Sequence, residues 1–586
     1  MEITNRFFFP LTFKIKFKAL LILLLLQLVG SVSAIRKRNS TIGRREGTWK
    51  LLSRNTGVVA MHMALTRHNT VIIFDQTQAG RSNYLLRRRR CLSIRSSNPK
   101  ALLRDSSCWA HSVEYDISRN SFQPLQLETD TWCSSGAFLS NGTLLQTGGH
   151  GNGYRRIRHF KSCSGGGSHR RRRRSSCGWR RSKVLLRDNR WFASNQILPH
   201  KDQTIVVGGK GVFTYEFVPK SKSSHEHRSF VLPFLHSTND EHEGGNNLYP
   251  FLHLSSDGNL FIFANRDSIL LNYRRNKVMK TFPRMPGAGS RNYPSSGSSV
   301  LLPLDHKDRF SKLEVMVCGG AASGAYRAAL EGRYVEALRS CGRMVITGNK
   351  HKWVMEEMPG PRLMSDMLIL PTGHILIING ARHGCAGRHN GTRPALEPYL
   401  YNPKKKLGRR FRVLPFTRIP RMYHSSAVLL PDGRILVAGG NPDERYTFRN
   451  VAFPTELRLQ AFVPHYMDHS FHHIRPRNVT VSYTHGGDGA RYGEEFRVRF
   501  RLHKKTERDL KFSVYAPPFT THAFSMNQRM LRLWCKRVEK EKDGWVSAVV
   551  EAPPSPNVAP SGYYLLTVVN DGIPSISEWV KFIQSE

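Results

Sequence analysis

The sequence lacks a long hydrophobic segment. Its apolar run from Ala19 to Leu26 is well short of the ~20 residues that span a bilayer, which argues against a transmembrane anchor. Basic residues precede the run, and the small residues Val32-Ser33-Ala34 follow it. This order is typical of a secretory signal peptide, predicted here over residues 1–34. We therefore expect a secreted, extracellular protein of the cell wall or apoplast.

Acidic residues are also scarce. The chain has 43 Asp and Glu against 89 Lys and Arg, a formal net charge of +46. Arginine runs occupy 87–90, 170–174 and 180–181. Nucleic acid is not the predicted partner, because no helix-turn-helix, zinc-finger or RNA-binding signature accompanies the runs and the chain is expected outside the cell. The runs fit either solvated loops or docking on a polyanion such as cell-wall pectin, and both interpretations stay open.

The apolar spacing of three and four that marks helical repeats is missing as well. Instead, an apolar strand, a tight turn and a second apolar strand recur, often followed by two glycines. Clear copies are AFLSNGTLLQTGG from Ala137, QILPHKDQTIVVGG from Gln196, LHLSSDGNLFIFAN from Leu252, LILPTGHILIING from Leu368 and AVLLPDGRILVAGG from Ala427. The five copies have one turn residue each: Asn141, His200, Asp257, Thr372 and Asp432. These lie 59, 57, 115 and 60 positions apart, so the third gap holds two periods.

Two further copies complete the series. A stretched copy starts at Ser299, inside the double gap, and another starts at Met63. The period, slightly above the ~50 residues of kelch repeats, predicts an all-β fold with a seven-bladed kelch-like β-propeller over residues 48–455. Short alternating strands then predict an immunoglobulin-like β-sandwich over residues 472–584. We expect a monomer.

Nine cysteines in an oxidising compartment should pair where they can. The short spacings suggest three disulfides: Cys91 with Cys108, Cys163 with Cys177, and Cys318 with Cys341. Cys133, Cys385 and Cys535 are left over. The odd count indicates at least one thiol with another fate.

One register of the repeat is a candidate ligand-binding ring. In a propeller, the starts of the inner strands converge at one end of the axis. The residues eight positions before each turn residue are Cys133, Phe192, Tyr249, Met364 and His424. For Tyr249 and Met364, packing of the funnel is the favoured interpretation, since large apolar groups usually fill such tapers.

Several long segments resemble one protein family. They are TDTWCSSGA around Cys133, RWFASNQILP around Phe192, NNLYPF around Tyr249, RNYPSSGSSVLLPL around Tyr293, IPRMYHSSAVLLPDGRILVAGGNP around His424 and PPFTTHAFSMNQR around His522. These segments resemble plant glyoxal oxidase-like proteins and, more distantly, galactose oxidase. The resemblance runs from about Trp49 to Phe582.

The resemblance implies a copper radical oxidase that oxidises aldehydes or primary alcohols and reduces O2 to H2O2. One copper ion would be held by Tyr423, His424 and His522, with Tyr423 also accepting the substrate proton. Cys133 matches the cysteine that forms a thioether with a radical-bearing tyrosine. Imidazole and phenolate are good Cu(II) ligands, and a neighbouring tyrosine and histidine are expected to point in different directions along a strand.

Position 192 departs from the family pattern. The family has there the tyrosine that binds copper, forms the thioether and holds the radical, whereas this chain has Phe192. Phenylalanine has no phenol oxygen to bind a metal or to be oxidised, so the Cys-Tyr thioether cofactor should not form. Tyr249 is a less favoured substitute because it projects from the next blade, farther from Cys133.

Two functions therefore remain open. One is an aldehyde or alcohol oxidase of the glyoxal oxidase type, impaired by Phe192. The other is a non-catalytic secreted propeller that binds cell-wall polysaccharide through its basic loops. Residue 192 separates them, because the resemblance favours the enzyme and the chemistry of the site favours its impairment.

Overall fold

The computed structural model describes residues 46–86, 108–163, 177–220, 228–484, 486–503 and 509–584. The predicted signal peptide, Cys91 and the arginine runs 87–90 and 170–174 lie outside these ranges. Strands dominate the described residues, as the repeat predicts, and the fold is all-β. Among these residues, none of the helices combines the length and the apolar character needed to cross a bilayer.

The first three sheets of the N-terminal part are antiparallel meanders whose strands follow chain order. The first sheet contains β2 (His62–Leu65), β3 (Thr70–Phe74), β4 (Ser112–Asp116) and β5 (Ser121–Leu125). The second contains β6 (Ser135–Phe138), β7 (Leu144–Thr147), β8 (Ile157–Lys161) and β9 (Gly178–Arg181). The third contains β10 (Ser194–Ile197), β11 (Thr204–Val207), β12 (Thr214–Val218) and β13 (Phe230–Val231).

The next three sheets repeat this arrangement. The fourth contains β14 (Phe251–Leu254), β15 (Leu260–Ala264), β16 (Asp267–Asn272) and β17 (Lys277–Thr281). The fifth contains β18 (Ser298–Leu301), β20 (Glu314–Cys318), β21 (Ser340–Val345) and β22 (Val354–Glu357). The sixth contains β23 (Asp366–Ile369), β24 (Ile375–Ile378), β27 (Tyr399–Tyr401) and β28 (Phe411–Val413).

A seventh sheet joins the two ends of this series. Its order is β29 (Ser425–Leu429), β30 (Ile435–Gly439), β31 (Leu459–Pro464) and β1 (Gly47–Ser53), so the first strand of the described chain pairs with β31. β31 follows residue 455, where the sequence places the end of the first domain. Short accessory elements lie between the sheets: α4 (Pro233–Ser237), α5 (Ala325–Leu330) and the hairpin β25 (Ala381–Gly384) with β26 (Gly391–Pro394).

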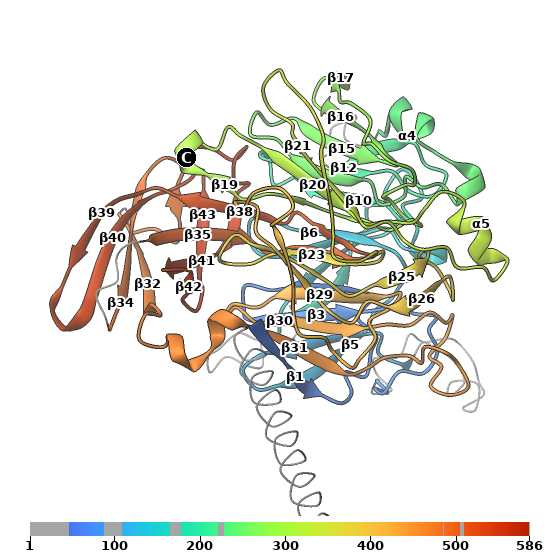
Figure 1. Ribbon diagram of the computed structural model, residues 1–586, viewed down its shortest axis with the longest axis horizontal. Coiled ribbons are helices and arrows are strands. Elements are labelled where there is room, and N and C mark those ends of the chain that lie inside the picture. Colours follow the sequence, from blue (N-terminus) through green and yellow to red (C-terminus); the bar gives the residue numbers. More distant parts are fainter. Residues whose placement is uncertain are drawn as a thin grey trace, which may run out of the picture.

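The C-terminal part contributes two further sheets, which lie to one side of the others (Figure 1). One contains β32 (Arg477–Tyr483), β34 (Glu495–Arg501), β40 (Trp545–Glu551) and β39 (Cys535–Lys540). The other contains β19 (Leu304–Asp305), β38 (Arg529–Leu533), β35 (Leu510–Ala516), β41 (Gly562–Asn570), β42 (Ile573–Pro574), β43 (Glu578–Ile583) and β33 (Ala490–Arg491). β34 alternates exposed and buried residues in a strict period of two, which explains how one of its faces reaches the apolar core.

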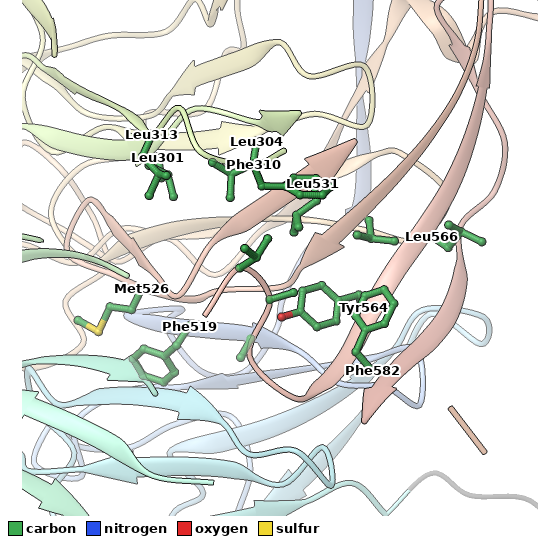
Figure 2. Close-up of a cluster of buried hydrophobic side chains, with 14 of the residues drawn as sticks. Leu301, Leu304, Phe310, Leu313, Phe519, Met526, Leu531, Tyr564, Leu566 and Phe582 are labelled. Atoms are coloured by element: carbon green, nitrogen blue, oxygen red, sulfur yellow. The ribbon is translucent and has the colours of Figure 1, made fainter. Parts of the chain in front are cut away.

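A hairpin from the C-terminal part enters the N-terminal sheets. It consists of β36 (Phe519–Thr521) and β37 (Phe524–Met526), and β36 pairs with β2 as an extra strand of the first sheet. Phe519 and Met526 pack in one buried cluster with Leu531 and Tyr564 of the C-terminal sheet (Figure 2). The two parts of the chain thus share a core.

Two of the predicted disulfides form, Cys163–Cys177 and Cys318–Cys341. The Cys91 half of the third pair lies outside the described residues. Cys133, Cys385 and Cys535 are free, as the spacings predict.

Candidate metal centre

The five residues counted back from the turns share one backbone conformation. Each lies just before the innermost strand of its sheet and has a left-handed φ: Cys133 54°, Phe192 65°, Tyr249 49°, Met364 56° and His424 64°. All five are buried. Left-handed φ is uncommon outside glycine, so its recurrence at one register indicates a shared bend into each strand.

Backbone hydrogen bonds join this register from sheet to sheet. The amide of Phe192 donates to the carbonyl of Cys133 at 3.0 Å, and the amide of Tyr249 donates to that of Phe192 at 2.9 Å. In the stretched repeat, the equivalent residue is Ser296, with φ 46°, whose carbonyl accepts from the Met364 amide at 2.6 Å. Residues far apart in sequence are thus held side by side.

The hairpin β36–β37 brings a histidine to the same place. Its two strands contact the innermost strand of all seven N-terminal sheets. Two amides at its base fix its position: Asn527 accepts from the Ile197 amide at 2.6 Å, and Gln528 accepts from the Ile369 amide at 2.7 Å and donates to the Met367 carbonyl at 2.9 Å. At its turn lies His522, with a left-handed φ of 45°.

His522 meets two of the register residues. Its Nε2 lies 3.3 Å from Cys133 Sγ, and its ring centroid lies 5.0 Å from that of His424. One ligand atom from each of the three side chains falls within 4.8 Å of the others. The Tyr423 ring stacks on His424, with centroids 3.8 Å apart. The structure therefore brings together Cys133, Tyr423, His424 and His522, which the sequence predicted as one site.

The stacking of Tyr423 and His424 corrects one expectation. Neighbours on a regular strand would point to opposite faces. His424 instead has a positive φ and precedes β29, so the chain bends there and both rings lie against each other.

The orientation of His522 is set by Thr521. The Thr521 hydroxyl donates to the Met61 carbonyl at 3.0 Å, and its oxygen lies 2.7 Å from His522 Nδ1. Because the single hydroxyl hydrogen is used at Met61, Nδ1 must be the donor in the second contact. Nε2 of His522 then carries the lone pair and faces Cys133. A metal-binding histidine is usually fixed in this way through its other nitrogen.

His424 has no such fixation. Neither of its ring nitrogens has a hydrogen-bond partner, although the side chain is only 4% exposed. Buried polar atoms are normally paired. An unpaired imidazole beside another imidazole and a thiol is therefore a candidate metal ligand.

Burial keeps these groups uncharged. It raises the pKa of the Cys133 thiol well above its usual value, and nearby Asp130 adds to this effect. Burial, followed by the charge of His424, lowers the pKa of His522, and burial also lowers that of His424. The pKa of Tyr423 is raised well above its usual value by burial and by neighbouring Tyr293. The site thus offers neutral donors at neutral pH.

Phe192 lies among aromatic rings. Its centroid lies 4.5 Å from that of Tyr293, 4.8 Å from that of Trp191, 5.6 Å from that of Tyr249 and 6.0 Å from that of His522. It thus borders the cluster without supplying an oxygen. The hydroxyl of Tyr249 donates to the Ser134 carbonyl at 3.1 Å.

Counting back eight positions from each turn residue did not identify Tyr293. Its hydroxyl lies 2.8 Å from that of Tyr423, and its ring is tilted by 30° against Phe192. Tyr293 is three residues before Ser296, so the count did not reach it, although it lies in one of the segments that carry the family resemblance.

An aromatic wall behind Phe192 was also missed. It consists of Trp132, His150 and Trp191, whose ring centroids lie 4.5 to 5.1 Å apart. Two cations cover it, Arg388 over Trp132 at 4.8 Å and Lys210 over Trp191 at 5.2 Å. The two tryptophans directly precede Cys133 and Phe192, and this adjacency is the one signal in the sequence that could have indicated the wall.

The chain matches two family models, and together these cover most of its length. Residues 61–466 match "Glyoxal oxidase N-terminus", and residues 475–582 match "Galactose oxidase-like, Early set domain". The chain is thus a galactose oxidase-like N-terminal domain followed by an early-set C-terminal domain.

Curated relatives and solved structures agree with this match. Aldehyde oxidase GLOX of Vitis pseudoreticulata is 41% identical over 538 residues, covering 92% of this chain and 97% of the relative. Aldehyde oxidase GLOX1 of Arabidopsis thaliana is 41% identical over 547 residues, covering 92% and 85%. A fungal alcohol oxidase of the AA5 family, solved in complex with copper, shares the fold with a TM-score of 0.64 at 16% identity, covering 92% of this chain and 99% of that one. The chain belongs to the glyoxal oxidase family.

Proposed function

We propose that this protein is a secreted copper-dependent oxidase of the glyoxal oxidase type whose turnover is strongly impaired by Phe192. Its substrates would be small aldehydes or primary alcohols, with O2 reduced to H2O2. The observation that carries the proposal is the convergence of Tyr423, His424, His522 and Cys133, with Phe192 at the border of the cluster.

The residues present fit a copper ion. Two imidazoles and a phenol are suitable donors for Cu(II), and both nitrogens of His424 are buried without a partner. Tyr423, His424 and His522 would hold the metal. Bound copper would supply one-electron redox chemistry and a site for the substrate oxygen.

The side chains around the metal would accept and transfer protons. The Tyr423 hydroxyl lies 2.8 Å from that of Tyr293. As a metal ligand Tyr423 would be a phenolate, which could take a proton from a substrate carbon and share it with the Tyr293 hydroxyl.

Phe192 lacks the phenol that would hold the radical, which is the second one-electron oxidant of the family's site. In the family, the tyrosine at this position is a ligand, a cross-link partner and a radical. Phenylalanine provides none of these, so we propose that the Cys-Tyr thioether cofactor does not form. Because such roles act as a unit, the loss falls on turnover more than on apparent substrate affinity.

The test is the substitution Phe192→Tyr. Both forms are loaded with copper under air, and peroxide production from small aldehydes is measured. We expect kcat to rise by at least about 100-fold in Phe192→Tyr, on the scale of losses from removing one member of a catalytic unit. Mass spectrometry should show the loss of two hydrogens that accompanies thioether formation, in Phe192→Tyr alone.

Phe192→Leu is the matched control, because it changes the buried ring without adding a phenol, and it should stay as slow as the natural form. A natural form that makes peroxide as fast as Phe192→Tyr would overturn the proposal. Tyr293, which packs on Phe192, would then be the residue to substitute next.

The architecture and location belong to the same proposal. We infer that the seven N-terminal sheets are the blades of one closed β-propeller with the hairpin β36–β37 along its axis. The contact of that hairpin with all seven innermost strands supports this arrangement.

The disulfides Cys163–Cys177 and Cys318–Cys341 support an oxidising, extracellular location. We propose a monomer.

A non-catalytic polysaccharide-binding protein is the second candidate. Phe192 and the net charge of +46 favour it. Cosedimentation with pectin that is weakened by salt, together with an inactive Phe192→Tyr form, would favour this alternative over the oxidase.

A further inference from the structure

We propose that the Cys133 thiolate is a direct metal ligand in this chain, so that the site holds its metal ion through one sulfur and two imidazole nitrogens. This inference rests on the metal site proposed above. It assigns Cys133 a different role, because the residue would bind the metal itself instead of being joined to a tyrosine.

The distances suit such a site. With bonds of ~2.0 Å to nitrogen and ~2.3 Å to sulfur, a tetrahedral metal separates a nitrogen and a sulfur ligand by about 3.5 Å. Cys133 Sγ and His522 Nε2 lie 3.3 Å apart. Their positions thus match two ligands of one ion.

His424 can supply the third ligand. The ligand atoms of the three side chains lie within 4.8 Å of one another, and no hydrogen bond holds the His424 ring. One nitrogen of this ring is therefore available to a metal ion, while stacking on Tyr423 keeps the ring in place. Tyr423, stacked on His424, is placed for a fourth, oxygen ligand.

Phe192 leaves the thiol available. Cys133 is free and 0% exposed, and its neighbour at the next register position is a hydrocarbon ring that cannot form a cross-link through a phenol. The same substitution that removes an oxygen ligand thus leaves a sulfur ligand in place.

The ligand set selects a soft or borderline ion. Thiolate favours Cu(I) and Zn²⁺, and a cysteine with two histidines also suits copper in electron-transfer sites. Binding breaks the S–H bond of Cys133 and forms a sulfur–metal bond, and the proton leaves to solvent, so no electron is transferred.

The experiment uses Co²⁺ added to the full chain under nitrogen. We expect a sulfur-to-cobalt charge-transfer absorption with one ion bound per chain. Cys133→Ser should lose this absorption entirely. Cys385→Ser, which removes another buried free thiol, is the matched control and should keep it.

A second measurement covers the case in which Cys133→Ser does not fold. X-ray absorption of the Zn²⁺-loaded natural chain should show one sulfur at ~2.3 Å beside nitrogen at ~2.0 Å. A shell of nitrogen and oxygen only, or a charge-transfer absorption that survives in Cys133→Ser, would overturn the inference. Neither readout depends on peroxide, so failure of the oxidase proposal leaves a sulfur-ligated site recognisable.

Discussion

The site is built from two regions that reach it by different routes. Cys133 and His424 come from the repeated sheets, where each occupies the same left-handed position before an innermost strand. His522 comes from a single hairpin that has no counterpart in the repeat. The repeated region fixes its residues through backbone geometry, whereas the hairpin, besides its pairing with β2, is held by the side chains of Phe519, Asn527 and Gln528.

This difference has a consequence for mutation. The register positions carry five different side chains on one backbone bend, so the bend does not depend on the side chain. Among the described strands, the hairpin joins the sheets by backbone pairing at β2 alone, so its side chains should carry much of the stability of the site. Three predictions test this contrast.

The largest effect should follow the loss of Phe519. This ring is fully buried in β36, and a Cβ added to Gly136 would lie only 2.6 Å from it, which shows how closely the hairpin packs. We expect Phe519→Ala to lower the free energy of unfolding by about 3–5 kcal/mol, because a buried aromatic ring leaves a cavity. Urea denaturation measures it. Phe416→Ala, whose ring is 63% exposed, should change it by less than ~0.5 kcal/mol.

A smaller loss is expected at Gln528. Replacing it with leucine leaves the Ile369 amide and the Met367 carbonyl buried without partners. We expect Gln528→Leu to cost about 1–3 kcal/mol in the same denaturation experiment. Gln123→Leu is the control, because Gln123 is an exposed residue of the edge strand β5, and it should leave the stability nearly unchanged. Equal stability of Gln528→Leu and the natural chain would mean that the hairpin does not depend on this contact.

The third effect, comparable in free energy to that at Gln528, should appear in metal binding. Thr521→Val removes the oxygen that orients His522 and leaves the imidazole itself in place. We expect Co²⁺ affinity to fall by about 10- to 100-fold, as is typical for a group that orients a metal-binding histidine. Equilibrium titration against a chelator measures it. Thr520→Val, the neighbouring substitution in β36, should leave the affinity unchanged, and a comparable loss there would show that the effect is not specific to His522.

The repeat located part of the candidate cluster, because a turn at a constant distance marks an equivalent residue in each sheet. Cys133, Phe192 and His424 were found in this way. His522 could be assigned only through the family resemblance, since nothing in its surroundings has the spacing of the repeat. Tyr293 was missed because its sheet contains a stretched turn and because its place is set by contacts with Phe192 and Tyr423. Such contacts between distant segments leave no pattern along the chain.

The pairing of β1 with β31 sets an order of events during synthesis. Ser53 has left the ribosome long before Pro464 is made, an interval of about 20–80 s at typical translation rates of ~5–20 residues per second. Throughout that time Gly47–Ser53 has no partner strand, and the chain carries an open edge on which another molecule could add. The newly made protein is therefore most vulnerable to aggregation before its last quarter emerges, and a nascent chain stalled before Leu459 should be a good substrate for chaperones.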